Sequence, residues 1–222
     1  MSPSALLLAD ASPDVGFEKK RLVLEGLRAQ FGRPAVVLPG HVPIGVPGLD
    51  AWLGGWPVGA VSEVTGQPGS GRLALVLPAL RRLARQGQRA VLVDPGQIFH
   101  PPAAPETCEA LLLLRPPPAQ AAWAAEQVAR AGVVPLLVLL DLPPLGRTGV
   151  RLAKAAEAGR TTVVVLNEVA EADLPASLRL CVPGWASGGA LRVQCARVRG
   201  GRAVGERHVH LQGRILSTVG RM

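Results

Sequence analysis

Short continuous apolar runs alternate along this chain with longer stretches in which apolar residues recur at helical spacing. Runs of the first kind are typical of strands buried on both faces; they lie at residues 60–64, 89–93, 110–114, 133–140 and 161–166. Stretches of the second kind predict helices over residues 72–86 and 119–131. This order indicates an α/β fold with a mostly parallel sheet flanked by helices.

Local details of the two helices can also be predicted. Glu126 and Arg130 are four residues apart, which is the spacing of a helical ion pair, and Gly132 is expected to end the same helix. Pro78 lies inside the other predicted helix. Because proline has no backbone N–H, we expect a kink there.

The two ends of the chain differ from the middle. Residues 18–31 have helical spacing and are stopped by Gly32 and Pro34, which predicts an N-terminal helical segment over residues 1–34. Residues 191–195 and 206–212 alternate between apolar and polar side chains around a Gly200-Gly201 turn. This pattern predicts a C-terminal antiparallel hairpin, so residues 35–222 are expected to form the core with its hairpin and tail.

Composition narrows the possible functions. The chain has 24 Lys and Arg against 16 Asp and Glu, a net charge of +8 that favours acidic partners such as nucleic acid, although a general arginine bias explains it equally well. With four Trp, three Phe and no Tyr, a base-stacking platform for single strands is not expected. Three scattered cysteines indicate a reducing compartment. No signal peptide or membrane span is recognisable, so we expect a cytoplasmic protein with no membrane partner.

A glycine-rich loop follows the first predicted strand. Its spacing is that of a phosphate-binding loop, in which backbone N–H groups close around phosphate oxygens at the start of a helix. Two side chains differ from that pattern, because Arg72 stands in place of the lysine and Leu73 in place of the hydroxyl that binds Mg²⁺. We therefore predict a degenerate nucleotide-binding loop made of Gly66, Gly69, Ser70, Gly71, Arg72 and Leu73. A purely structural turn and weak ATP binding through Arg72 both stay open, and no cofactor is expected.

Residues 44–50, the glycine-rich turn at 54–59 and Glu63 before this loop resemble the opening of the RecA recombinase core. Further matches follow in order over roughly residues 17–212. The resemblance implies a RecA-like P-loop core, with Asp141 as the vestigial Walker B aspartate and Asn167 and Glu168 at the γ-phosphate sensor. It also places Gly96 where RecA has the glutamate that orients the attacking water, and glycine has no group for that work. ATP hydrolysis is not expected.

RecA binds single-stranded DNA through two long loops. The corresponding connections here, residues 141–161 and 169–190, are short and carry no cluster of basic and glycine residues. Recombination by this chain alone is not expected.

A truncated RecA-like chain that ends in a basic hairpin is similar to the ImuA family of bacterial mutagenesis accessory proteins. Residues 56–60, 122–127 and 197–201 carry this likeness beside the loop. It implies an adaptor in SOS-induced, error-prone translesion DNA synthesis. The implied partners are an ImuB-type homologue of Y-family polymerases and an error-prone C-family DNA polymerase, with RecA as a further candidate. A SulA-like cell-division inhibitor and a weakly active RecA-type DNA-dependent ATPase are the alternatives.

Arginines accumulate near the C-terminus and are candidate contacts to DNA or to an acidic partner. Arginine binds phosphate without reading base sequence. A solvated hairpin face explains the same pattern equally well. The candidates are Arg192, Arg197, Arg199, Arg202, Arg207 and Arg214.

Overall fold

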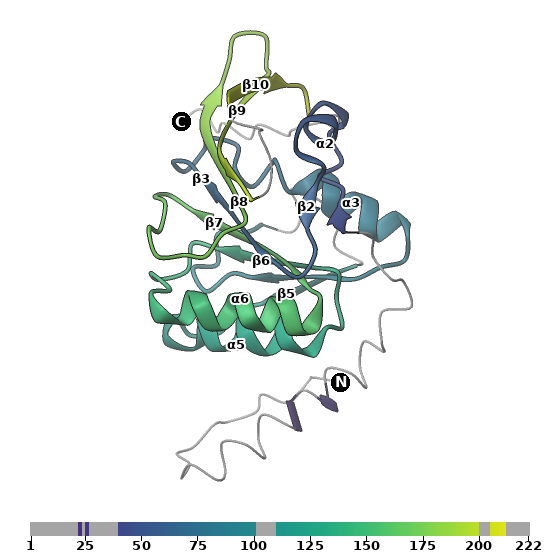
Figure 1. Ribbon diagram of the computed structural model, residues 1–222, viewed down its shortest axis with the longest axis vertical. Helices are drawn as coiled ribbons and strands as arrows, with labels where there is room; N and C mark the ends of the chain where they lie inside the picture. The colour runs from purple at the N-terminus through teal and green to yellow at the C-terminus, as the bar shows by residue number, and fades with distance from the viewer. Residues whose placement is uncertain (1–21, 24, 27–39, 101–109, 200–204, 212–222) are drawn as a thin grey trace.

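A computed structural model describes residues 22, 23, 25, 26, 40–100, 110–199 and 205–211. An eight-stranded sheet forms its centre, with strand order β10-β9-β8-β3-β7-β6-β4-β5 (Figure 1). The strands are β3 (Val61–Thr65), β4 (Ala90–Val93), β5 (Leu111–Leu114), β6 (Leu136–Leu140), β7 (Thr162–Asn167), β8 (Leu178–Trp185), β9 (Leu191–Val198) and β10 (Gly205–Val209). A small separate ribbon pairs β1 (His41–Val42) with β2 (Trp56–Pro57).

Helices cover both faces of the sheet. α2 (Pro47–Leu53) and α3 (Leu77–Arg85) lie on one face, while α5 (Pro118–Ala131) and α6 (Arg147–Gly159) lie side by side on the other (Figure 1). Successive residues of a strand point to opposite faces. In β6, Val138 therefore belongs to the core under α3, and Leu137 and Leu139 belong to the core under α5 and α6.

Strand directions confirm the expected fold class. The six strands from β8 to β5 are parallel to one another, whereas β9 is antiparallel to both β8 and β10. The predicted hairpin is confirmed by its register, in which Gly205 pairs with Cys195 and Val209 with Leu191. All five strands expected from apolar runs are present, with ends that differ by at most three residues.

The kink expected at Pro78 is wrong. Residues 72–76 form turns, and α3 begins only at Leu77. Pro78 is therefore in the first turn of the helix, where a missing N–H breaks no helical hydrogen bond. Other predictions for helices are confirmed, since Gly132 ends α5 with a left-handed backbone and Arg130 pairs with Glu126 at 2.7 Å.

Five described elements were not predicted: β1, α2, β2, α6 and β8. The last two lie in the connections whose sequences indicated only that they are short, α6 within residues 141–161 and β8 within residues 169–190. α6 is held to α5 by Arg151, which bonds the second carboxylate oxygen of Glu126. β8 lies between β3 and β9 in the sheet and buries Leu178 and Leu180 in the core on the face covered by α3.

Most of the predicted N-terminal helix at residues 18–31 lies outside the described residues, as does the Gly200-Gly201 turn. Leu22, Val23, Glu25 and Gly26 are described and are helical. None of the described helices is long and apolar enough to cross a membrane.

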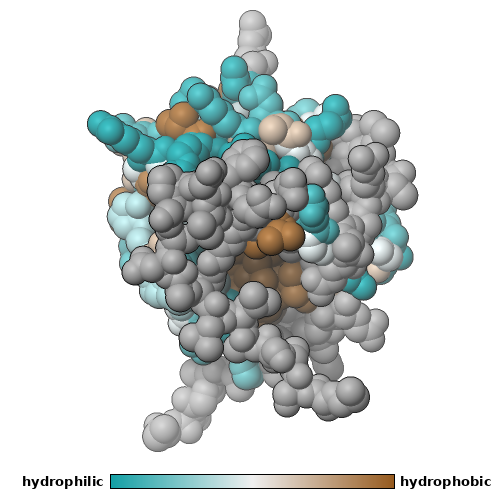
Figure 2. All heavy atoms as spheres, turned by 90° about the horizontal axis from the view of Figure 1, so that it is seen from below, coloured by the Kyte–Doolittle hydropathy of each residue, from teal (hydrophilic) through white to brown (hydrophobic). Residues whose placement is uncertain are grey.

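On the face seen from below, hydrophobic atoms lie at the centre and hydrophilic side chains gather along one edge (Figure 2).

Candidate functional site

The residues singled out in the sequence follow three neighbouring parallel strands. The glycine-rich loop comes after β3, Asn167 ends β7, and Asp141 comes directly after β6. Since β3, β7 and β6 are adjacent in the sheet, their carboxyl ends meet at one edge. Ligands of open α/β sheets bind at this edge. The fold therefore brings the three predicted groups together.

Arg72 and Asp141 form a two-pronged ion pair at this edge. Nη1 of Arg72 lies 2.7 Å from Oδ1 of Asp141, and Nη2 lies 2.5 Å from Oδ2. The side chain of Arg72 is only 7% exposed and that of Asp141 is 20% exposed. A planar guanidinium matches a carboxylate in this way, which a lysine does not. The loop cation and the Walker B carboxylate thus neutralise each other.

Side chains of β8 and β9 crowd the glycine-rich loop. Gly71 has a left-handed backbone (φ 98°), and a Cβ on it would lie 2.5 Å from Leu191 and 3.0 Å from Trp185. Ser70 is buried, and its hydroxyl has no hydrogen-bond partner in the described part of the chain. The loop therefore packs against the C-terminal hairpin region.

Asp94, which follows β4, stabilises the loop that comes after it. Asp94 is fully buried and accepts hydrogen bonds from the backbone N–H groups of Ile98 (2.9 Å) and Phe99 (3.0 Å). Gly96 lies within the turn that these bonds close. Asp94 thus fixes its own loop, and no carboxylate is available at position 96 to orient water.

At the sensor position, Asn167 is tied to the loop that follows it. Its Nδ2 donates to Oε1 of Glu171 at 3.2 Å, and Oε2 of Glu171 accepts the N–H of Leu145 at 2.9 Å. Asn167 is nearly buried, whereas Glu168 is exposed. The sensor amide therefore connects two loops of the protein.

Glu63, noted in the sequence only for its likeness to RecA, is the centre of a buried network. It accepts the backbone N–H of Glu171 (2.7 Å), and Nε of Arg179 lies 3.3 Å from its carboxylate. Arg179 also donates to the carbonyls of Glu171 and Leu174, each at 2.7 Å. Burial raises the pKa of Glu63, and the Glu171 N–H and the Arg179 charge only partly offset this. The network fastens the loop after β7 to β3.

Arg179 and Glu171 were missed in the sequence because their roles depend on β8. Arg179 is the register partner of Glu63 across the β3–β8 pair. The alternation of Leu178, Arg179 and Leu180 was the available signal for this strand.

A magnesium–nucleotide complex does not fit these residues. Phosphoryl transfer needs a hydroxyl and a carboxylate for Mg²⁺ and a free cation for the phosphates. Leu73 has no oxygen and packs against the hydrophobic core, and the Asp141 carboxylate is already bonded to Arg72. The donor set of a nucleotide-hydrolysing site is therefore not assembled.

The candidate arginines that the structure describes do not gather into one patch. Arg192 pairs with Glu206 at 3.1 Å, and hydrogen bonds from Arg192 first, then Gln194 and His208, lower the pKa of Glu206 to about 2. The guanidinium of Arg207 lies over the ring of Trp52, 5.0 Å from its centre. Arg197 and Arg199 are exposed near the far end of β9. Arg202 and Arg214 lie outside the described residues.

Comparison with curated proteins finds RecA sequences. RecA of Bacillus licheniformis and RecA of Bacillus subtilis strain 168 are each 31% identical to the chain over 132 residues, and RecA of Chlorobaculum tepidum is 33% identical over 133 residues. Over this stretch the chain is similar to RecA. Each of these matches covers 53% of the chain but only 38% of the RecA protein. No family model matches the chain.

The RecA-like fold is also found among solved structures. A crystal structure of the RadB recombinase superposes with a TM-score of 0.64, covering 75% of this chain and 94% of the RadB chain at 18% identity. At that identity the likeness concerns the fold, which is the RecA-like α/β core expected from the sequence.

Proposed function

We propose that this RecA-like chain is a non-hydrolysing adaptor in SOS-induced, error-prone translesion DNA synthesis. The Arg72–Asp141 ion pair is the observation that carries the first part of this proposal. A RecA core would use one of these charges to bind the triphosphate and the other to bind its metal ion, but here the two charges bond to each other. A site of this kind stabilises the fold and leaves the surface of the protein as the place where partners can bind.

The expected partners come from the likeness to the ImuA family. They are an ImuB-type homologue of Y-family polymerases and an error-prone C-family DNA polymerase, with RecA and DNA as further candidates. Similarity to RecA proteins supports a place in DNA repair or recombination in general. Of the candidate arginines, Arg197 and Arg199 are exposed and suited to a DNA phosphate or an acidic protein surface.

Nucleotide turnover tests the first part of the proposal. The purified chain is incubated with ATP and Mg²⁺, with and without single-stranded DNA, beside the variants Arg72→Ala and Arg85→Ala, the second of which changes an exposed arginine on α3. We expect phosphate release at the background rate for all three proteins. DNA-stimulated release that is lost in Arg72→Ala and kept in Arg85→Ala would instead establish a RecA-type ATPase.

Capture from DNA-damaged cells tests the second part. A tagged chain expressed at its natural level is expected to retain the polymerase-like partner and the C-family polymerase, identified by mass spectrometry. Undamaged cells are the control for induction. Recovery of the tubulin-like division protein without any polymerase component would refute the adaptor role and support the division-inhibitor alternative.

A further inference from the structure

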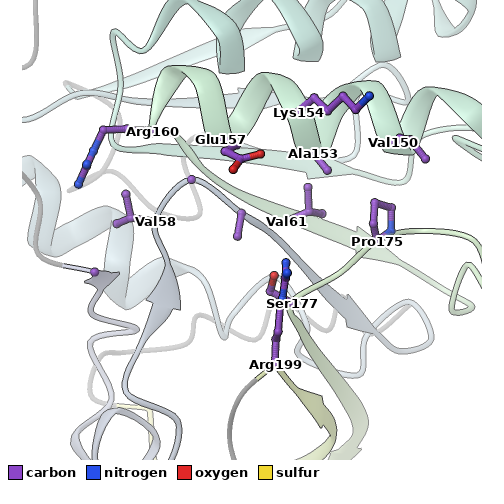
Figure 3. A pocket seen from close by; sticks show the side chains of 13 residues that line it. Val58, Val61, Val150, Ala153, Lys154, Glu157, Arg160, Pro175, Ser177 and Arg199 are labelled. Carbon is purple, nitrogen blue, oxygen red and sulfur yellow. The ribbon is translucent and has the colours of Figure 1, made fainter.

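A pocket of about 590 Å³ opens at the end of the sheet opposite the degenerate loop. Its floor is formed by residues 58–61, which lead into β3, and α6 forms one wall. Pro175, Ser177 and Arg199 form the wall across from α6 (Figure 3). The volume lies within the range of sites that enclose a small molecule or a short peptide segment.

Charge in the pocket is predominantly positive. Lys154, Arg160 and Arg199 line it, against the single carboxylate of Glu157. No side-chain hydrogen bond or ion pair engages these three cations within the described ranges. By contrast, Arg72, Arg151 and Arg192 are all bonded to carboxylates. Unpaired cations that line a concave surface favour an anionic ligand.

Part of the lining is apolar. Val150 and Ala153 on α6 lie on the same side of the pocket as Lys154, and Pro175 and Val61 complete the apolar surface (Figure 3). Val150 is 46% exposed, which is unusual for a large aliphatic side chain in this protein. A ligand that fills this pocket must therefore combine negative charge with an aliphatic group.

These features distinguish a peptide from nucleic acid. A nucleic acid backbone binds along open grooves that are basic throughout, often beside stacking aromatics. Among the described residues, no aromatic side chain lines this pocket. An acidic peptide supplies carboxylates for the cations and an aliphatic side chain for Val150.

We propose that the pocket between α6 and the start of β8 is a docking site for a short acidic segment of a partner protein that carries an aliphatic anchor residue. Docking here leaves the degenerate loop untouched, because the two sites lie at opposite ends of β3.

The probe is a fluorescein-labelled hexapeptide in which leucines alternate with glutamates and aspartates, titrated with the full chain and followed by fluorescence anisotropy. We expect measurable binding below about 1 mM. Arg199→Glu and Lys154→Glu should each weaken binding by about tenfold, since each removes one attraction and adds one repulsion. Arg85→Glu, which reverses an exposed charge on α3 at the opposite face of the sheet from α6, should change binding by less than about twofold.

Two further measurements distinguish binding in the pocket from a general loss of folding or charge. Glu157→Gln should strengthen binding by about threefold, which damage to the fold would not do. A matched peptide with serine in place of leucine should bind more weakly than the leucine peptide. Far-UV circular dichroism checks that each variant is folded.

The proposal is overturned by no binding at about 1 mM, or by equal weakening in Arg85→Glu and Arg199→Glu. It is also overturned if a single-stranded oligonucleotide binds more tightly than the peptide and loses that binding in Arg199→Glu, because the pocket would then be a nucleic-acid site. Neither result depends on ATP turnover or on which polymerase is captured.

Discussion

Changing Asp141 to asparagine should destabilise the protein substantially. Asp141 has a left-handed backbone (φ 46°), which asparagine tolerates better than most residues, so Asp141→Asn keeps the backbone while it removes the charge. Arg72 would then remain almost fully buried without a counter-charge. Breaking one side of a buried ion pair costs about 3–5 kcal/mol, and the partial exposure of Asp141 reduces our expectation to about 2–4 kcal/mol.

Urea unfolding at neutral pH, followed by tryptophan fluorescence and far-UV circular dichroism, measures the loss in the free energy of unfolding. Thermal unfolding is the second assay: at about 2–4 °C per kcal/mol for a chain of this size, the melting temperature should fall by about 4–16 °C. Arg72→Met in the Asp141→Asn background removes the stranded cation, so the double variant should be more stable than the sum of the single effects by about 1–3 kcal/mol.

Asp141→Ala is the matched control for backbone conformation. It should cost more than Asp141→Asn, because alanine is strained in the left-handed region by about 1–2 kcal/mol. A loss below about 1 kcal/mol in Asp141→Asn, together with strictly additive effects in the double variant, would show that the ion pair does not hold this site closed.

Other predictions concern single residues. Because the pKa of Glu63 is raised in the folded state, the folded protein holds the Glu63 proton more tightly than the unfolded chain does, and stability should fall as pH rises above about 4.5. Glu63→Gln should remove that part of the pH dependence in unfolding titrations. Glu206 should titrate at a pKa of about 2 by NMR and shift upward in Arg192→Met; its stabilisation of the hairpin should be complete above pH 4.5 and disappear as pH falls towards 2. Gly71→Ala should destabilise more than Gly69→Ala by about 1–3 kcal/mol in thermal unfolding, because both positions have positive φ but only a Cβ on Gly71 meets Leu191 and Trp185; equal losses would show that the loop does not pack against the hairpin.

The sequence predicted the parts of the fold that depend on local patterns. Buried parallel strands need continuous apolar runs, and this requirement revealed β3, β4, β5, β6 and β7. α5 was recognisable because its spacing, its Glu126–Arg130 pair and its terminal Gly132 all indicate the same helix. α6 and β8 were missed because the flanking prolines and glycines suggested loops, while their amphipathic patterns were short.

The chemistry of the candidate site also has one part that the sequence determines and one part that depends on the tertiary structure. That Leu73 offers no metal ligand and Gly96 no carboxylate follows from side-chain structure alone, so the sequence by itself determined that the loop is degenerate. That Arg72 pairs with Asp141, 69 residues away, and that Arg179 pairs with Glu63 were decided only by the tertiary structure. Local patterns report which residues are buried, but the partner of a buried charge depends on which strands become neighbours in the sheet.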